Sequence, residues 1–176
     1  AGQSSERIAI IGLAGRFPGA GDVNSFWAML EKGHSGLSKP PEDRRQVVTA
    51  CFALADKECF DAEFFGFAPS EAALMDPQQR VFLETAWHAM ENAGYGGGSD
   101  RMTGVFAASG FGDYVLKHVG LRSYADSAAE HFAMQIGNDK DFLASRVAHH
   151  LDLKGPAVVV QSACSSGLLA VHQAIQ

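Results

Sequence analysis

The chain has 176 residues, of which 47% are hydrophobic and 19% are charged, and its formal net charge at pH 7 is −6. This length and composition are sufficient for one globular domain with a substantial core. The negative charge argues against a general nucleic-acid-binding protein, and no apolar run is long enough to span a bilayer.

The cysteines at 51, 59 and 164 have no metal-ligand spacing and form no even set for disulfides. They indicate a reducing, cytoplasmic environment. We expect no metal and no directly bound cofactor. Asp139 and Asp141 are a weak metal alternative, because no third ligand is placed by spacing.

Arg7 to Leu13 (RIAIIGL) is typical of a short buried strand. Asn24 or Ser25 can cap a short helix, which Gly33 is expected to end. Residues 39–45 (KPPEDRR) have the composition of a loop. In this part of the chain we therefore predict one strand, one helix and a loop, in that order.

Apolar residues in Gln46 to Lys57 recur at helical spacing, but the sequence leaves the local structure of this segment open. Asp76 followed by Pro77 is a strong helix start, and Gly94 is the expected end. The helix between them should have two apolar faces. A narrow polar stripe separates these faces: Arg80, Glu84, His88 and Glu91. We interpret His88 as a solvated residue and not a catalytic one.

Thr103 to Ser109 (TGVFAAS) is predicted to be a strand. Gly110 to Ile136 shows no clear period and is interpreted as a mobile region that faces a partner. Asn138 is the expected cap of a helix that runs through Leu143, Val147 and Leu151.

The end of the chain has the most informative pattern. Ala157 to Gln161 is a short apolar run of the kind found in parallel strands buried on both faces. From Ser165 onward, apolar residues recur at helical spacing and also occupy the other sides, so we expect a helix buried nearly all round. Cys164 would then lie at a sharp turn from strand to helix.

A cysteine at that turn has consequences for reactivity. The first N–H groups of a helix lack partners within the helix, and the helix dipole adds positive potential there. Both effects stabilise a thiolate, the nucleophilic form of cysteine. The turn also lets the backbone N–H of Cys164 face an oxyanion. The alternative is that Cys164 is a small buried hydrophobic residue.

Several segments resemble motifs of one protein family, and they occur in the same order as in that family. SACSSGLLAVH, around Cys164, resembles the active-site segment of β-ketoacyl synthases. The resemblance extends to IAIIGLAGRFPGA, to FDAEFFGFAPSEAALMDPQQRVFLETAWHAMENAGY and to GNDKDFLASRVAHHLDLKGPAVVVQSACSS. The F-P-G and D-P-Q-Q-R blocks are similar to those of modular polyketide synthases. This resemblance implies an α/β fold of the thiolase type, with α-β-α-β-α layers.

The resemblance further implies that residues 1–176 are the N-terminal part of one ketosynthase domain that is incomplete at the C-terminus. Cys164 would be the acyl-accepting nucleophile. The family's two other catalytic residues are histidines of H-G-T-G-T and N-I-G-H motifs, which do not occur here. His172 lies eight residues along the helix from Cys164, a rise of roughly 12 Å, and cannot replace them.

The implied reaction has two steps. Cys164 takes an acyl group from the phosphopantetheine of an acyl carrier protein, and a decarboxylative Claisen condensation with a malonyl-type extender follows. The implied partners are the carrier protein, the C-terminal half of the domain and a second subunit in a homodimer. In related dimers the segment equivalent to Ala157–Gln161 pairs with its copy. Met134, Gln135 and Ile136 would lie near the acyl pocket of the other subunit, as substrate-binding residues.

Two other hypotheses stay open. One is a non-elongating or degenerate ketosynthase that acts in acyl transfer, docking or dimerisation. The other is an unrelated thiol hydrolase, which would need a nearby histidine that the sequence does not place. Because the final helix needs neighbours on every side, we also expect residues 1–176 alone to be neither a stable domain nor an active enzyme.

Overall fold

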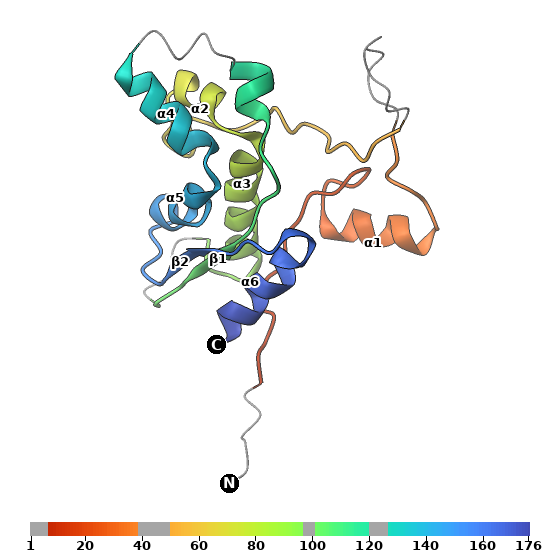
Figure 1. The fold of residues 1–176 in the computed structure, drawn as a ribbon. Helices are drawn as coiled ribbons and strands as arrows, with labels where there is room; N and C mark the ends of the chain where they lie inside the picture. The colour runs from red at the N-terminus through yellow and green to blue at the C-terminus, as the bar shows by residue number, and fades with distance from the viewer. Residues whose placement is uncertain (1–6, 39–49, 97–100, 120–126) are drawn as a thin grey trace.

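The computed structural model describes residues 7–38, 50–96, 101–119 and 127–176. In chain order the elements are α1 (Val23–Glu31), α2 (Pro69–Leu74), α3 (Pro77–Asn92), β1 (Val105–Ala107), the π-helix η1 (Val115–Val119), α4 (Ala128–Asn138), the 3-10 helix η3 (Lys140–Phe142), α5 (Leu143–His150), β2 (Ala157–Val159), the 3-10 turn η4 (Ala163–Ser165) and α6 (Ser166–Ile175). Figure 1 shows most of these helices gathered around one small sheet.

The sheet is a parallel pair, β1 and β2, with Val105 opposite Ala157 and Ala107 opposite Val159. Parallel strands need a crossover connection, and here it contains α4 and α5. Helix α5 contacts both strands, and α3 packs on α5 (Figure 1). The strands predicted at 103–109 and 157–161 are therefore confirmed over shorter ranges, and their parallel direction agrees with the expected α/β fold. Strand β2, however, is not buried on both faces as expected.

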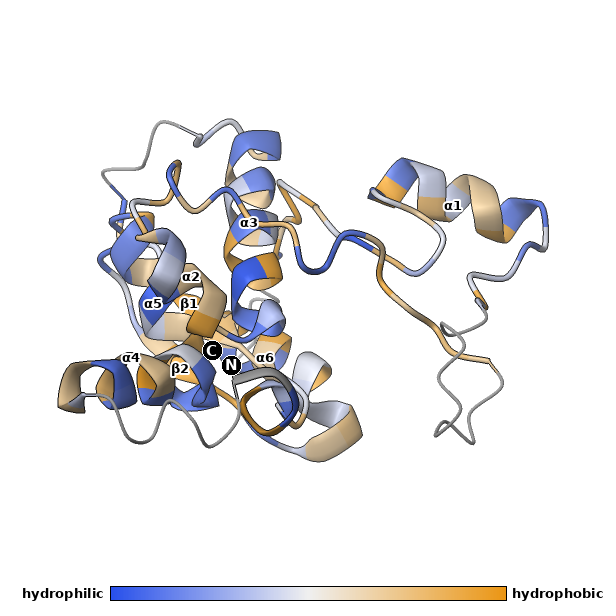
Figure 2. Ribbon diagram, turned by 90° about the horizontal axis from the view of Figure 1, so that it is seen from above, coloured by the Kyte–Doolittle hydropathy of each residue, from blue (hydrophilic) through white to orange (hydrophobic). Residues whose placement is uncertain are grey.

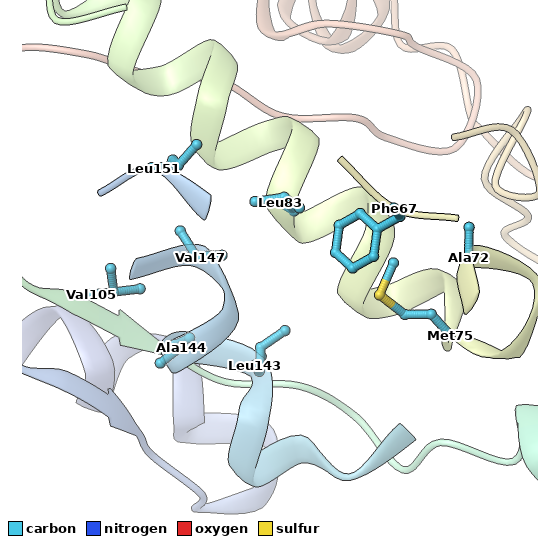
Figure 3. Packing of buried hydrophobic residues seen from close by; sticks show 10 residues of the cluster. Phe67, Ala72, Met75, Leu83, Val105, Leu143, Ala144, Val147 and Leu151 are labelled. Carbon is cyan, nitrogen blue, oxygen red and sulfur yellow. The ribbon is translucent and has the colours of Figure 1, made fainter. Parts of the chain in front are cut away.

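The core lies where α3, α5 and the sheet meet (Figure 3). Leu83 of α3 is 0% exposed, and Leu143 and Val147 of α5 are 1% and 2% exposed. Phe67 and Met75 extend this cluster beneath α2 and the start of α3. The periodic leucine and valine positions of both helices thus face one another, as their spacing predicts.

Helix α3 begins as predicted: the Asp76 side chain accepts from the Gln78 N–H at 2.8 Å, and Pro77 occupies the first turn. His88 is exposed, as predicted. Arg80, which belongs to the predicted polar stripe, is only 6% exposed. Its guanidinium donates to the Glu58 carbonyl at 3.2 Å, because the loop before α2 folds over that side of the helix.

Arg7 to Leu13 does not form the predicted strand. Its backbone instead meets the end of α3. The Leu13 N–H donates to Asn92 Oδ1 at 2.9 Å, and a Cβ on Gly12 would lie 2.5 Å from the Ala89 carbonyl oxygen. A strand needs a neighbouring strand to pair its backbone, and the described residues supply only β1 and β2. Apolar side chains therefore stay uncovered: Ile8, Ile10, Ile11 and Leu13.

Helix α1 confirms the predicted short helix, and Gly33 follows it with a φ of 65°. The N-cap is Asp22, earlier in the chain than expected, because Asp22 and Ser25 form a reciprocal capping box. Figures 1 and 2 show α1 away from the other helices. No residue of α1 is buried, and Trp27 is 62% exposed.

The loop prediction at 39–45 lies outside the described residues, as does the first part of Gln46–Lys57, the segment whose structure the sequence leaves open. Residues 50–57 are described and contain turns and a single bridge from Cys51 to Ser38, with no helix. The helical spacing of the apolar residues therefore corresponds to no helix in this described part. Phe52 is 67% exposed, so these apolar residues do not share one buried helical face.

The interpretation of Gly110–Ile136 as a segment without a clear period is wrong from residue 128 onward, because α4 occupies Ala128–Asn138. Ser127 caps it by accepting from the Glu130 N–H at 3.1 Å. The Ser-x-x-Glu spacing that begins a helix was present in the sequence and could have revealed it. Asn138 is the last residue of α4 and not the N-cap of the next helix; Asp139 caps the next turn, η3.

Helix α6 is present as predicted, but it is not buried all round. It rests on β1 and buries only Ser166 and Ala170. Leu168 is 81% exposed and Val171 is 58% exposed. The described residues supply a neighbour for one face of the helix, and the other faces stay open. Ala157 at the start of β2 is exposed for the same reason.

A cysteine turn as the candidate active site

The candidate site is the turn between β2 and α6. The ladder with β1 ends where the Val160 N–H donates to the Ala107 carbonyl at 2.8 Å. Ala163 then adopts a φ of 49°, in the left-handed region that residues other than glycine rarely occupy. Strain of this kind is concentrated at functional sites. The chain thus passes from strand to helix in a few residues, with Cys164 inside the turn.

Serine side chains hold this turn in place. The Ser162 N–H donates to Ser166 Oγ at 2.7 Å, and Ser166 Oγ donates to the Ala163 carbonyl at 2.8 Å. Ser165 Oγ donates to the Ser162 carbonyl at 2.8 Å. These bonds satisfy backbone groups that neither the sheet nor the helix reaches. This role of the serines was not predicted, although three serines within five residues at a helix start could have suggested it.

Cys164 is exposed, and it lies two residues before the first residue of α6. Because its side chain is exposed, the sulfur is accessible to a small thioester, while its neighbours in the turn hold the backbone in place. Cys59 is also exposed and Cys51 is half-buried, but both lie in the loops before α2. Cys164 is therefore the one cysteine that combines exposure with a strand-to-helix turn.

No histidine hydrogen-bonds Cys164 within the described parts of the chain. His172 is exposed on α6. Searching the described residues finds no group of three or more His, Cys, Asp or Glu side chains that could hold a metal ion. Asp139 instead accepts from the Asp141 N–H at 3.0 Å, which is a local cap. The hydrolase hypothesis gains no support from this arrangement.

The structure separates the other predicted site residues from Cys164. Met134, Gln135 and Ile136 lie in the second half of α4, which packs beside α2 and away from α6 (Figure 1). Met134 is 6% exposed, Gln135 is exposed and Ile136 is half-buried. Within one chain they do not form a common site with the cysteine.

Two basic side chains beneath α2 have altered acidities. Burial lowers the pKa of Arg146, and the nearby carboxylate of Glu71 partly opposes the change. Burial also lowers the pKa of His150, and the charges of His149 and Arg146 act in the same direction. Both residues contact the ring of Phe67. These two side chains help to hold α4 and α5 in place and are not part of the cysteine turn.

Residues 5–176 match the family described as Beta-ketoacyl synthase, N-terminal domain. The chain therefore belongs to the β-ketoacyl synthase family. It is 40% identical over 189 residues to a subunit of the phenolphthiocerol/phthiocerol polyketide synthase of Mycobacterium tuberculosis, with coverage of 95% of this chain and 13% of that protein. Polyketide synthase PksM of Bacillus subtilis is 41% identical over 180 residues, covering 96% of this chain and 4% of the relative.

Solved structures of ketosynthases also resemble this chain. The ketosynthase from module 6 of the bacillaene synthase of Bacillus subtilis superposes with a TM-score of 0.77 at 36% identity, over 96% of this chain and 28% of that one. The module 1 ketosynthase from Bacillus amyloliquefaciens has a TM-score of 0.82 at 32% identity, over 94% and 31%. These likenesses confirm the predicted α/β, thiolase-like fold. This chain spans less than a third of either solved chain.

None of the helices formed by the described residues combines the length and apolar character that a membrane crossing requires.

Proposed function

We propose that this chain supplies the acyl-accepting cysteine of a polyketide β-ketoacyl synthase. The thiolate of Cys164 attacks the acyl thioester on the phosphopantetheine of an acyl carrier protein. The acyl–sulfur bond to the carrier breaks, the carrier thiol leaves, and a new thioester forms on Cys164. Nucleophile and leaving group are both thiolates of similar basicity, so the exchange needs little driving force.

The observation that carries this proposal is the position of Cys164, exposed in a strained strand-to-helix turn in a chain that matches the synthase family along nearly its whole length. Backbone N–H groups at such a turn are suited to bind the oxyanion of the tetrahedral intermediate. The acyl group arrives on the carrier protein's own phosphopantetheine, so the chain needs no bound cofactor of its own for this step.

Condensation is the second proposed step. A malonyl-type extender on a carrier protein loses CO₂, and the resulting carbanion attacks the carbonyl of the Cys164 thioester, which releases the cysteine. The histidines that assist this step in the family lie in motifs absent from residues 1–176. We therefore propose that condensation needs the C-terminal half of the domain, and that the active form is a homodimer in which Met134, Gln135 and Ile136 approach the other subunit's acyl pocket.

The test is acyl loading on the whole polypeptide that contains residues 1–176. Incubation with an acyl N-acetylcysteamine thioester, followed by peptide mapping, should place the acyl group on Cys164. Cys164→Ala should abolish loading, whereas Cys59→Ala, which alters another exposed cysteine, should leave it unchanged. Loading that survives Cys164→Ala would overturn the proposal.

A non-elongating ketosynthase is the second candidate, because an exposed Cys164 in its turn serves acyl transfer whether or not condensation follows. Addition of a malonyl-loaded carrier protein to the acylated polypeptide separates the two. Release of a β-ketoacyl product identifies an elongating enzyme. Stable acylation of Cys164 with transfer only between carriers identifies the alternative.

A further inference from the structure

The C-terminal end of α4 is attached to the rest of the molecule through its backbone carbonyls. The last carbonyls of a helix have no partner within it. Here the Ile136 carbonyl accepts from Arg146 Nη2 at 2.8 Å, and the Gly137 carbonyl accepts from the Asp76 N–H at 2.9 Å. The carbonyl of Asp139, the residue after α4, accepts from Gln79 Nε2 at 3.0 Å. Two donors outside α4 thus bind its last turn, and a third binds the residue that follows it.

Gln79 and Arg146 act together in this attachment. Arg146 Nε donates to Gln79 Oε1 at 2.7 Å, while each side chain also donates to a carbonyl at the end of α4. Gln79 is only 3% exposed. The pair therefore joins α3 and α5 to the same turn of α4 by directional bonds, and neither side chain can move without breaking two of them.

The packing leaves this turn little freedom. A Cβ on Gly137 would lie 3.3 Å from Met75 Cα, so the backbone of α4 lies directly against the link between α2 and α3. Asn138 Nδ2 donates to the Leu74 carbonyl at 2.7 Å from the same turn. The position of α4 is consequently fixed at its C-terminal end.

The same C-terminal turn of α4 also carries side chains that face solvent. Gln135 is exposed and Ile136 is half-buried. Phe132, one turn earlier on the same side of the helix, is 61% exposed. A displacement at the attachment point would therefore shift a surface that is available to another molecule.

We propose that Gln79 and Arg146 are positioning residues that set the acyl-chain selectivity of the synthase by fixing Met134–Ile136. This inference rests on the proposed function, in which that segment approaches the acyl pocket of the other subunit. Neither residue touches the substrate. Their loss moves the pocket wall, which changes how long and short acyl chains are discriminated.

Two measurements on the whole polypeptide test this. The first is hydrogen exchange. Gln79→Leu removes both bonds of Gln79, and the amides of residues 135–139 should exchange about fivefold faster or more, as expected for the loss of one hydrogen bond. Gln79→Glu keeps the acceptor for Arg146 and loses the donor to Asp139, so it should have a smaller effect. It also serves as the second variant if Gln79→Leu does not fold.

The second measurement is selectivity. The ratio of kcat/KM for acylation of Cys164 by a long-chain and a short-chain acyl N-acetylcysteamine thioester should change about tenfold in Arg146→Lys, because a small displacement near a bound substrate has large kinetic effects. Arg80→Lys is the matched control, since Arg80 is a buried arginine that also donates to a carbonyl, but its acceptor, Glu58, belongs to the loop before α2. A merely destabilised protein would lose activity toward both thioesters by the same factor.

The outcomes separate the two proposals. Unchanged exchange at 135–139 in the Gln79 variants overturns the positioning role whether or not the polypeptide loads acyl groups. Faster exchange with an unchanged selectivity ratio overturns the link to substrate choice. Failure of the unaltered polypeptide to acylate Cys164 overturns the proposed function, and the selectivity proposal with it.

Discussion

Ser162 and Ser166 lie on opposite sides of Cys164 and are joined directly, because the backbone N–H of Ser162 donates to Ser166 Oγ at 2.7 Å. The same Oγ donates to the Ala163 carbonyl at 2.8 Å, and Ser166 is 6% exposed. One buried hydroxyl thus closes the turn from both ends. The backbone around the cysteine is held before any substrate arrives.

Ser166→Ala should therefore destabilise the protein by about 1–2 kcal/mol, because it leaves a donor and an acceptor in the turn without partners. It should also slow acylation of Cys164. Urea unfolding and loading kinetics measure the two effects. Ser145→Ala is a matched control: Ser145 Oγ donates to the Phe142 carbonyl three residues earlier but is exposed. Equal effects of the two substitutions would contradict the role of Ser166.

The left-handed conformation of Ala163 makes a second prediction. Ala163→Gly should change the free energy of unfolding by less than about 1 kcal/mol, because relief of strain offsets the greater freedom of the unfolded chain. Ala163→Val should cost about 1–3 kcal/mol, since a β-branched side chain is disfavoured at a φ of 49°. Comparable unfolding midpoints for the two variants would show that the turn does not hold this conformation.

Local signals in the sequence were sufficient for several elements. Asp76 before Pro77 identifies the start of α3, and the Gly155-Pro156 entry with an apolar run identifies β2. These signals act over a few residues and depend little on distant partners. Cys164 was placed in its turn for the same reason.

Features that depend on distant partners were not predicted. Arg7 to Leu13 has the composition of a strand but lacks a strand to pair with among the described residues. The burial of Arg80 depends on a loop that approaches from another part of the chain. The link between Gln79 and Arg146 joins residues 67 positions apart. No periodicity within one helix could indicate such a contact.

The lowered pKa of His150 makes a third prediction. Its folded pKa lies below the unfolded value of about 6.5. Between these two values the unfolded chain binds more protons, so stability is complete above about pH 6.5 and falls as the pH decreases. His150→Gln should weaken this decrease in the free energy of unfolding, measured with urea at about pH 7.5 and about pH 5.5. His172→Gln, at an exposed position on α6, should retain it.

The last prediction concerns the exposed apolar face of α6. Leu168, Val171 and Ile175 are 81%, 58% and 44% exposed, and a continuous apolar surface of this kind favours association. Residues 1–176 expressed alone should bind a hydrophobic dye and lack a sharp thermal transition. Leu168→Lys combined with Val171→Lys should improve the solubility of this isolated chain.

In the whole polypeptide the same pair should instead abolish folding, because we propose that the C-terminal half of the synthase domain covers this face. Gln173→Lys, at another exposed position on α6, controls for added charge and should be tolerated in both. A cooperative transition of the isolated chain, or tolerance of the double substitution by the whole polypeptide, would show that α6 needs no such cover.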